Sequence, residues 1–148
     1  AGLDDCRARY GLEPQDIGIE LTENILIKAG SEALEELKKQ RKKGVEISVD
    51  DFGVGYSSLS YLKHFPVSHL KIDRTFLKDA PESAYDGALM EAIVNVGHKL
   101  DLFIVAEGVE TAEQSRYCQE LKVEYVQGFL YAKPMPAREL EKLLMSTE

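Results

Sequence analysis

The fold of this chain is decided by one stretch, Ile47-Ser48-Val49-Asp50-Asp51-Phe52-Gly53-Val54-Gly55-Tyr56-Ser57-Ser58. Residues 45–49 form a short apolar run with β-branched side chains, which is typical of a buried strand. Two adjacent carboxylates and a glycine-containing loop follow it. Adjacent carboxylates repel each other at the end of a buried strand unless a cation lies between them. Taken alone, an Asp-Asp pair is also typical of a turn or a helix cap.

Strands and helices alternate on both sides of this stretch. The hydrophobic pattern predicts strands at 17–21, 45–50, 69–73, 102–106 and 125–131. Helices are predicted at 1–12, 31–43, 83–100, 111–121 and 137–145, with a shorter one from Ser57 or Ser58 to Pro66. We expect Ser31 and Thr111 to cap two of them and Gly44 to end one. This alternation predicts an α/β fold with a parallel sheet or a barrel.

The length of the chain limits that barrel. At 148 residues, 44% of them hydrophobic, the chain is long enough for one domain with a core. A complete eight-stranded (β/α) barrel usually needs about 250 residues. We therefore predict a TIM-type (β/α) barrel that is incomplete in this chain, with about five strands and their helices.

The net charge of −8 argues against a polymeric nucleic acid as partner, because its phosphates would be repelled. A small phosphate ester can still bind to an acidic protein if metal ions supply the positive charge. Cys6 and Cys118 have no metal-type spacing, and no signal peptide or membrane-spanning run is present. From these features we expect a cytoplasmic domain with reduced thiols.

Acidic residues recur where the predicted strands end. Glu20 and Glu23 close the first strand, Asp50 and Asp51 the second, and Glu107 the fourth. In (β/α) barrels the active site lies at the carboxyl ends of the strands. Carboxylates that converge there from several strands are what a pair of Mg²⁺ or Mn²⁺ ions requires. With these companions, and with Lys71 inside an apolar strand, the metal interpretation of the Asp-Asp pair is favoured over the cap.

Five strings of the sequence resemble one family. They are Glu-Leu-Thr-Glu (20–23), Val-Asp-Asp-Phe-Gly-Val-Gly-Tyr-Ser-Ser-Leu (49–59), Leu-Lys-Ile-Asp-Arg (70–74), Val-Ala-Glu-Gly-Val-Glu-Thr (105–111) and Gln-Gly-Phe-Leu-Tyr-Ala-Lys-Pro (127–134). In order and spacing they are similar to EAL-domain cyclic-di-GMP phosphodiesterases over nearly the whole chain. The resemblance implies metal-dependent hydrolysis of cyclic di-GMP to the linear dinucleotide pGpG, in bacterial second-messenger signalling.

The resemblance also implies a role for each matching residue at the centre of the site. Glu20 and Asp50 correspond to ligands of the first metal, and Asp50 bridges to the second metal. Asp51 corresponds to a ligand of the second metal. Lys71 matches the lysine that positions the nucleophilic water, and Glu107 matches the general base. Two divalent ions, Mg²⁺ or Mn²⁺, are thus the expected cofactors.

Other matching residues would support the substrate or the loop at 53–58, which begins at Gly53 and in the family contributes to dimerisation. Glu23 corresponds to the acid that anchors this loop, although it fits equally well as the acidic first-turn residue of a helix. Gln127 corresponds to a pocket residue near the metals. Arg74, in the third string, is the remaining candidate for substrate support. Glu110 is expected to be a helix-start residue with no catalytic role.

Two family features are missing from this sequence: an early strand Glu-Ala-Leu whose glutamate binds metal, and an asparagine ligand on a strand before the first one seen here. A literal Glu-Ala-Leu occurs at 32–34, but there it follows a predicted helix start. We therefore expect residues 1–148 to be the C-terminal portion of a single EAL domain, attached to upstream sensory or GGDEF-type domains. The alternative is a cyclic-di-GMP receptor or interaction module that has lost catalysis.

We predict that the 148-residue chain by itself is not an active phosphodiesterase and that it self-associates as a homodimer or larger oligomer. It lacks two metal ligands, and its five strands leave two open edges and an uncovered barrel interior. Light scattering and a hydrolysis assay with Mg²⁺ or Mn²⁺ test both parts. A monodisperse monomer that hydrolyses cyclic di-GMP as fast as a form extended upstream would contradict them.

Overall fold

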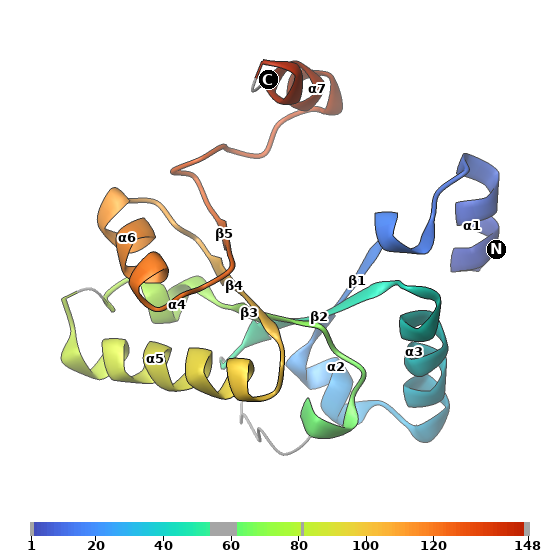
Figure 1. Ribbon diagram of the computed structural model, residues 1–148, viewed down its shortest axis with the longest axis horizontal. Helices are drawn as coiled ribbons and strands as arrows, with labels where there is room; N and C mark the ends of the chain where they lie inside the picture. Colours follow the sequence, from blue (N-terminus) through green and yellow to red (C-terminus); the bar gives the residue numbers. More distant parts are fainter. Residues whose placement is uncertain (1, 54–61, 81, 147–148) are drawn as a thin grey trace.

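The computed structural model describes residues 2–53, 62–80 and 82–146. Its centre is a five-stranded parallel sheet whose strands lie side by side in sequence order, β1-β2-β3-β4-β5 (Figure 1). The strands are β1 (Gly18–Thr22), β2 (Glu46–Phe52), β3 (His69–Ile72), β4 (Phe103–Glu107) and β5 (Tyr125–Gln127). Sequential order without reversal is the order of a (β/α) barrel, so the α/β fold and its incomplete barrel are confirmed.

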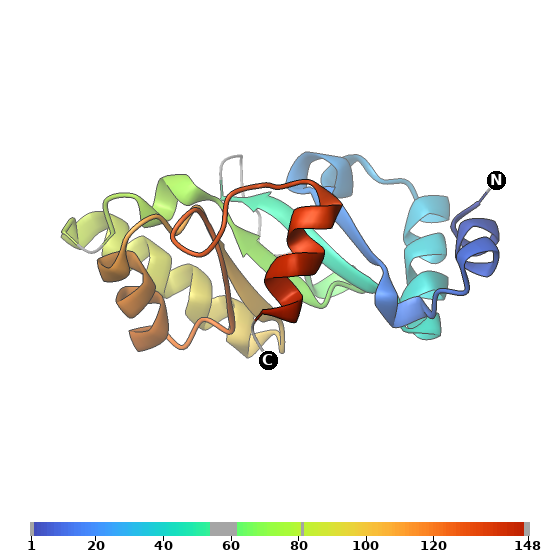
Figure 2. The same cartoon turned by 90° about the horizontal axis from the view of Figure 1, so that it is seen from above.

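The helices lie on both sides of the sheet. Figures 1 and 2 show α5 and α7 on opposite sides of it, with α7 reached by the segment that follows β5. None of the described helices is long and apolar enough to cross a membrane. The helices are α1 (Leu3–Tyr10), α2 (Glu23–Lys28), α3 (Ser31–Lys43), α4 (Arg74–Leu77), α5 (Ala84–Lys99), α6 (Ala112–Glu120) and α7 (Ala137–Met145), with 3₁₀ turns at Pro14–Asp16 and Leu62–His64.

The hydrophobic core lies on the α5 side of the sheet. Alternation along the strands directs every second side chain to this side. The core side chains of the three central strands are buried, namely Ile47, Val49, Leu70, Ile72, Ile104 and Ala106. Cys118 is buried in the same core, whereas Cys6 is exposed, and both thiols are free.

The apolar stripe of α5 differs from the one that its sequence pattern predicts. The spacing of apolar residues predicts a buried stripe of Tyr85, Leu89, Ile93, Val96 and Leu100, but Tyr85 is 78% exposed. The buried face instead comprises Met90, Ile93, Val94 and Gly97. At Gly97, a Cβ atom would lie 2.3 Å from Cδ1 of Ile104, so only glycine allows the helix to approach the sheet this closely. This contact sets the rotation of the helix.

Several predicted boundaries also change. The N-cap of α3 is Gly30 rather than Ser31. The predicted end of this helix at Gly44, which has φ +104°, is confirmed. The capping box of Thr111 with Gln114 is confirmed at α6. The helices α2 and α4 were not predicted. Apart from the 3₁₀ turn, the helix predicted from Ser57 or Ser58 lies outside the described residues.

Strand β5 ends at Gln127 rather than at residue 131 because the chain turns against Val109. The Val109 N–H donates to the Gln127 carbonyl at 3.0 Å, and the Leu130 N–H donates to the Val109 carbonyl at 3.0 Å. A Cβ atom on Gly128 would lie only 2.1 Å from that carbonyl oxygen. The turn therefore depends on glycine at this position.

The side of the sheet opposite the core is open to solvent in this chain. Phe103 is 49% exposed and Tyr125 is 52% exposed, and their rings lie 6.1 Å apart there. The helix α7 has no buried residue, and its apolar side chains Leu140, Leu143, Leu144 and Met145 are all exposed. The exposed rings on β4 and β5 belong to the uncovered barrel interior that five strands were expected to leave.

We expect Gly128→Ala to lower the free energy of unfolding by about 1–3 kcal/mol, because backbone atoms of Val109 occupy the space a methyl group needs. Gly18→Ala is the matched control, since the nearest atom to a Cβ at Gly18 would be the Glu46 carbonyl oxygen, at 4.0 Å. Urea denaturation of the two variants measures the difference. Equal stabilities would contradict the close approach at Gly128.

Candidate active site

A β-bulge brings the two aspartates of β2 to one side of the sheet. Val49 pairs with Leu70 and Phe52 pairs with Ile72, so two residues of β2, Asp50 and Asp51, lie opposite the single residue between Leu70 and Ile72 of β3. Asp51 takes a left-handed backbone conformation, with φ +53°. In a regular strand, consecutive side chains point to opposite faces. The bulge removes that alternation at the Asp-Asp pair.

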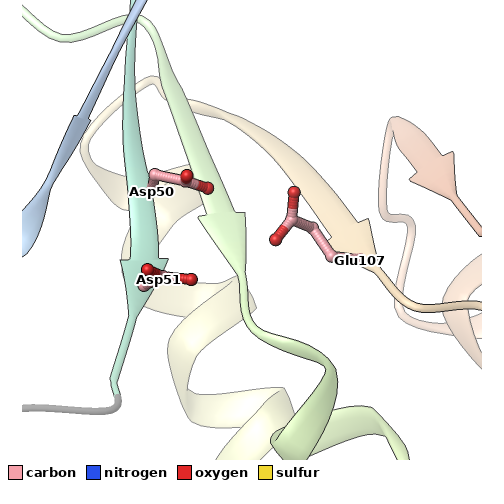
Figure 3. A group of neighbouring side chains, drawn as sticks. All are labelled: Asp50, Asp51 and Glu107. Carbon is pink, nitrogen blue, oxygen red and sulfur yellow. The ribbon is translucent and has the colours of Figure 1, made fainter.

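As a result, three carboxylates gather at the ends of β2 and β4. Asp50, Asp51 and Glu107 each offer an oxygen atom, and these atoms all lie within 4.8 Å of one another. Figure 3 shows the two aspartates on β2 and Glu107 at the end of β4, with β3 between them. Clustered carboxylate oxygens are the ligands that Mg²⁺ and Mn²⁺ prefer, so these residues fit a divalent ion.

Lys71 of β3 lies opposite the bulge and contacts carboxylates from three other strands. Its Nζ atom lies 2.9 Å from Glu20 of β1, 2.9 Å from Asp50 of β2 and 2.8 Å from Glu107 of β4. The Lys71 side chain is only 8% exposed. Lys71, which the sequence places inside an apolar strand, is thus surrounded by the acidic residues of the neighbouring strands.

The ammonium group of Lys71 stays charged in this setting. Burial by itself would lower the pKa of Lys71, because it penalises the charged form. The hydrogen bonds to Glu107, Asp50 and Glu20 outweigh burial and raise the pKa of Lys71 above its ordinary value. Lys71 is therefore a permanent positive charge within the acidic site.

Glu20 lies on β1 two residues before the position that pairs with Asp50. It is in the middle of β1, not at its end, and pairs with Ser48, whereas Thr22 pairs with Asp50. Its side chain is 55% exposed and reaches the cluster through Lys71. The structure thus brings together the five residues predicted for the centre of the site, namely Glu20, Asp50, Asp51, Lys71 and Glu107. Glu20 joins the group by its contact with Lys71.

Glu23 has both of the features that the sequence left open. It is the first residue of α2 and is 4% exposed. Its Oε2 atom accepts a hydrogen bond from the N–H of Gly53 at 3.4 Å. Gly53 has φ +96°, and a Cβ atom there would lie 2.5 Å from the ring of Phe76. Glu23 thus contacts the start of the loop that follows β2, and residues 54–58 of this loop lie outside the described residues.

Gln127 and Arg74 line a cleft of about 490 Å³ beside the carboxylate cluster. Gln127 pairs with Glu107 across β4 and β5, which places it next to the site. Gly108, with φ +70°, packs directly against Arg74. Other residues that line the cleft are Glu110, Phe129, Lys133, Met135 and Leu140.

Sequence reasoning missed most of this cleft. Glu110 was assigned only to a helix start, but it lines the cleft just before the cap of α6. Glu113 does lie in the first turn of α6, where it forms a 3.2 Å surface ion pair with Arg116. The position of Glu110 and Phe129 in the sequence could have indicated this cleft, because both residues lie within strings that match the family.

The Glu-Ala-Leu at 32–34 lies on the outer helix α3, with Glu32 exposed.

Comparison with known proteins agrees with this fold and site. The family model described as "EAL domain" matches residues 3–134. This match assigns the five-stranded (β/α) sheet, with the carboxylates and the lysine at its strand ends, to a known family of domains. This chain belongs to the EAL-domain family.

Individual relatives share most of the chain. The bifunctional diguanylate cyclase/cyclic di-GMP phosphodiesterase MucR of Pseudomonas aeruginosa is 46% identical over 132 residues, which cover 89% of this chain and 19% of MucR. The solved cyclic-di-GMP complex of the PaMucR phosphodiesterase is 43% identical, with a TM-score of 0.86, over 93% of this chain and 56% of that one. A manganese/cyclic-di-GMP complex of Klebsiella pneumoniae BlrP1 is 35% identical, with a TM-score of 0.82. The match covers 89% of this chain and 34% of the BlrP1 chain.

We expect Asp50→Asn to weaken the binding of Mn²⁺ at least about tenfold, because it removes the charge of the carboxylate shared by the cluster and Lys71. Isothermal titration calorimetry on the full-length protein measures the affinity. Asp79→Asn, at an exposed position outside the cluster, is the control for the loss of one negative charge. Unchanged affinity in Asp50→Asn would favour a capping role for the pair.

Proposed function

We propose that this chain is the C-terminal portion of an EAL domain that hydrolyses cyclic di-GMP to pGpG with two divalent ions, Mg²⁺ or Mn²⁺. The observation that carries the proposal is the convergence of Glu20, Asp50, Lys71 and Glu107 from four adjacent strands. The activity for which MucR is named and the cyclic-di-GMP complexes of PaMucR and BlrP1 support the same substrate.

In this proposal Glu20, Asp50 and Asp51 would hold the two ions, as the matching residues of the family do. The manganese in the BlrP1 complex supports divalent ions in this fold. When bound, the ions supply Lewis acidity, which stabilises the charge that builds on the phosphate oxygens and makes a water molecule more acidic. In the family, the glutamate of the Glu-Ala-Leu strand and an asparagine would complete the ligand set.

Glu107 and Lys71 act on the attacking water in this proposal. Lys71 donates a hydrogen bond to its oxygen, and Glu107 accepts its proton as the oxygen attacks one phosphorus atom. One phosphate ester bond of the ring breaks, and the departing ribose oxygen takes up a proton. The product is the linear dinucleotide.

The cleft beside the cluster is the proposed place for the rest of the nucleotide. Arg74 at its wall has a guanidinium group that pairs well with phosphate oxygens. Gln127 offers an amide next to Glu107, and Phe129, Met135 and Leu140 provide apolar surface. Such a mixture of apolar walls and a few polar groups is typical of small-molecule sites.

The rival function is a cyclic-di-GMP receptor without catalysis. Degenerate members of this kind usually lack some of the acids or the lysine, whereas this chain has Glu20, Asp50, Asp51, Lys71 and Glu107. The presence of all five residues favours the enzyme over the receptor. We also propose self-association, location in the cytoplasm, and attachment to sensory or GGDEF-type domains.

We expect Glu107→Gln in the full-length protein to lower the turnover of cyclic di-GMP by about 10²–10⁴-fold, because the amide cannot accept a proton from water. Binding of the nucleotide should remain close to that of the parent protein. An assay of pGpG formation and calorimetry with cyclic di-GMP measure the two effects.

Glu113→Gln is the matched control, since Glu113 is an exposed residue on α6. Near-normal turnover in Glu107→Gln would remove this residue from the mechanism. If Glu107→Gln instead weakens Mn²⁺ binding as strongly as Asp50→Asn does, Glu107 is a metal ligand rather than the base.

A further inference from the structure

A side-chain hydrogen bond ties one wall of the cleft to α6. This wall belongs to the segment that follows β5, which Figures 1 and 2 show on its way to α7. Phe129 and Ala132 of this segment line the cleft. Tyr131, between them, places its hydroxyl group against α6, where its oxygen lies 2.8 Å from the hydroxyl oxygen of Ser115. The bond thus joins the wall to a helix outside the cleft.

Ser115 is a fixed partner for this bond. It lies within α6 and is only 9% exposed. The helix is anchored on both sides of it, because Cys118 is buried in the core and the Tyr117 hydroxyl donates to the Gly87 carbonyl of α5 at 3.1 Å. Buried hydroxyl groups are almost always hydrogen-bonded, and Tyr131 provides the partner here. The core therefore sets the position of Ser115.

Backbone hydrogen bonds hold only the first part of the wall. Val109 donates to the Gln127 carbonyl and accepts from the Leu130 N–H, each at 3.0 Å. The later part of the wall lies at 132–136, where the chain forms neither helix nor strand, and the helix α7 that follows has no buried residue. Tyr131 lies between these two parts. Its bond to α6 is thus placed where the braced turn passes into the irregular part of the wall.

We propose that Tyr131 is a positioning residue for the nucleotide, because its hydrogen bond to Ser115 holds the wall at 129–135 in place relative to Arg74 and Gly108 of the same cleft. This inference rests on the proposed function for the identity of the ligand. Loss of the bond lets the wall move, which weakens binding of the nucleotide. The clustered carboxylates lie on β2 and β4, so the affinity for Mn²⁺ does not depend on this bond.

Tyr131→Phe tests the proposal because it removes only the hydroxyl group. In the full-length protein we expect it to raise the KM for cyclic di-GMP about three- to tenfold, the effect typical of one hydrogen bond. The kcat and the affinity for Mn²⁺ should stay within about twofold of the parent. Tyr85→Phe is the matched control, since it removes the hydroxyl group of a tyrosine that is 78% exposed on α5. An unchanged KM in Tyr131→Phe would overturn the proposal.

Ser115→Ala tests the same bond from α6. We expect this variant to raise KM as much as Tyr131→Phe does, although the substitution lies in a helix and not in the cleft wall. The double variant should show no further rise, because the two substitutions remove one shared interaction. Effects on KM that multiply in the double variant would show independent causes and contradict the proposal.

Hydrogen exchange measured by NMR tests the hold on the wall without any ligand. Ser115→Ala should accelerate exchange of the Leu130 amide at least about threefold, because the turn that donates this N–H to Val109 loses its tie to α6. The Leu121 amide, which donates to the Tyr117 carbonyl at the end of α6, should exchange as in the parent. Exchange of Leu130 at the parent's rate would overturn the hold on the wall.

The outcomes separate this inference from the proposed function. Faster exchange of Leu130 in a protein that neither binds nor hydrolyses cyclic di-GMP supports the hold of Tyr131 on the wall and refutes cyclic di-GMP as the ligand. Hydrolysis by the parent, with an unchanged KM in Tyr131→Phe, refutes the positioning role alone.

Discussion

The acidic site depends on one interaction, the contact of the Lys71 ammonium group with three carboxylates. This group contacts Glu20, Asp50 and Glu107 and so links β1, β2, β3 and β4 at one edge of the sheet. Without a cation, these carboxylates would repel one another. One buried positive charge lets three strands present acidic groups at the same place. The acidic site and the register of the sheet thus stabilise each other.

The bulge in β2 determines what this acidic edge can bind. A regular strand would direct Asp51 away from Asp50, and only one carboxylate of the pair would face Glu107. Because two residues of β2 lie opposite Lys71, both aspartates reach the cluster. Aspartate tolerates the left-handed backbone that this requires better than most residues do. Bulges are common beside active sites for this reason: they redirect a side chain.

Close contacts of two glycines fix the neighbouring cleft. Gly108 follows Glu107 and packs against Arg74, and Gly128 follows Gln127 and packs against the backbone of Val109. Each contact leaves no space for a methyl group. Together they hold the ends of β4 and β5 beside each other, so that a carboxylate, an amide and a guanidinium group surround one cleft.

Local signals in the sequence were sufficient for the architecture. The alternation of strands and helices, the stop at Gly44 and the cap at Thr111 depend on residues near one another in the chain, and the structure confirms them. The family strings predicted Glu20, Asp50, Asp51, Lys71 and Glu107, which the structure brings together. Tertiary structure alone decided that Asp51 joins Asp50 on one face and that Tyr85 is exposed, because a bulge depends on the neighbouring strand and a helix rotation on packing against the sheet. The three partners of Lys71 come from strands up to 51 residues away in the sequence, and only folding brings them to one ammonium group.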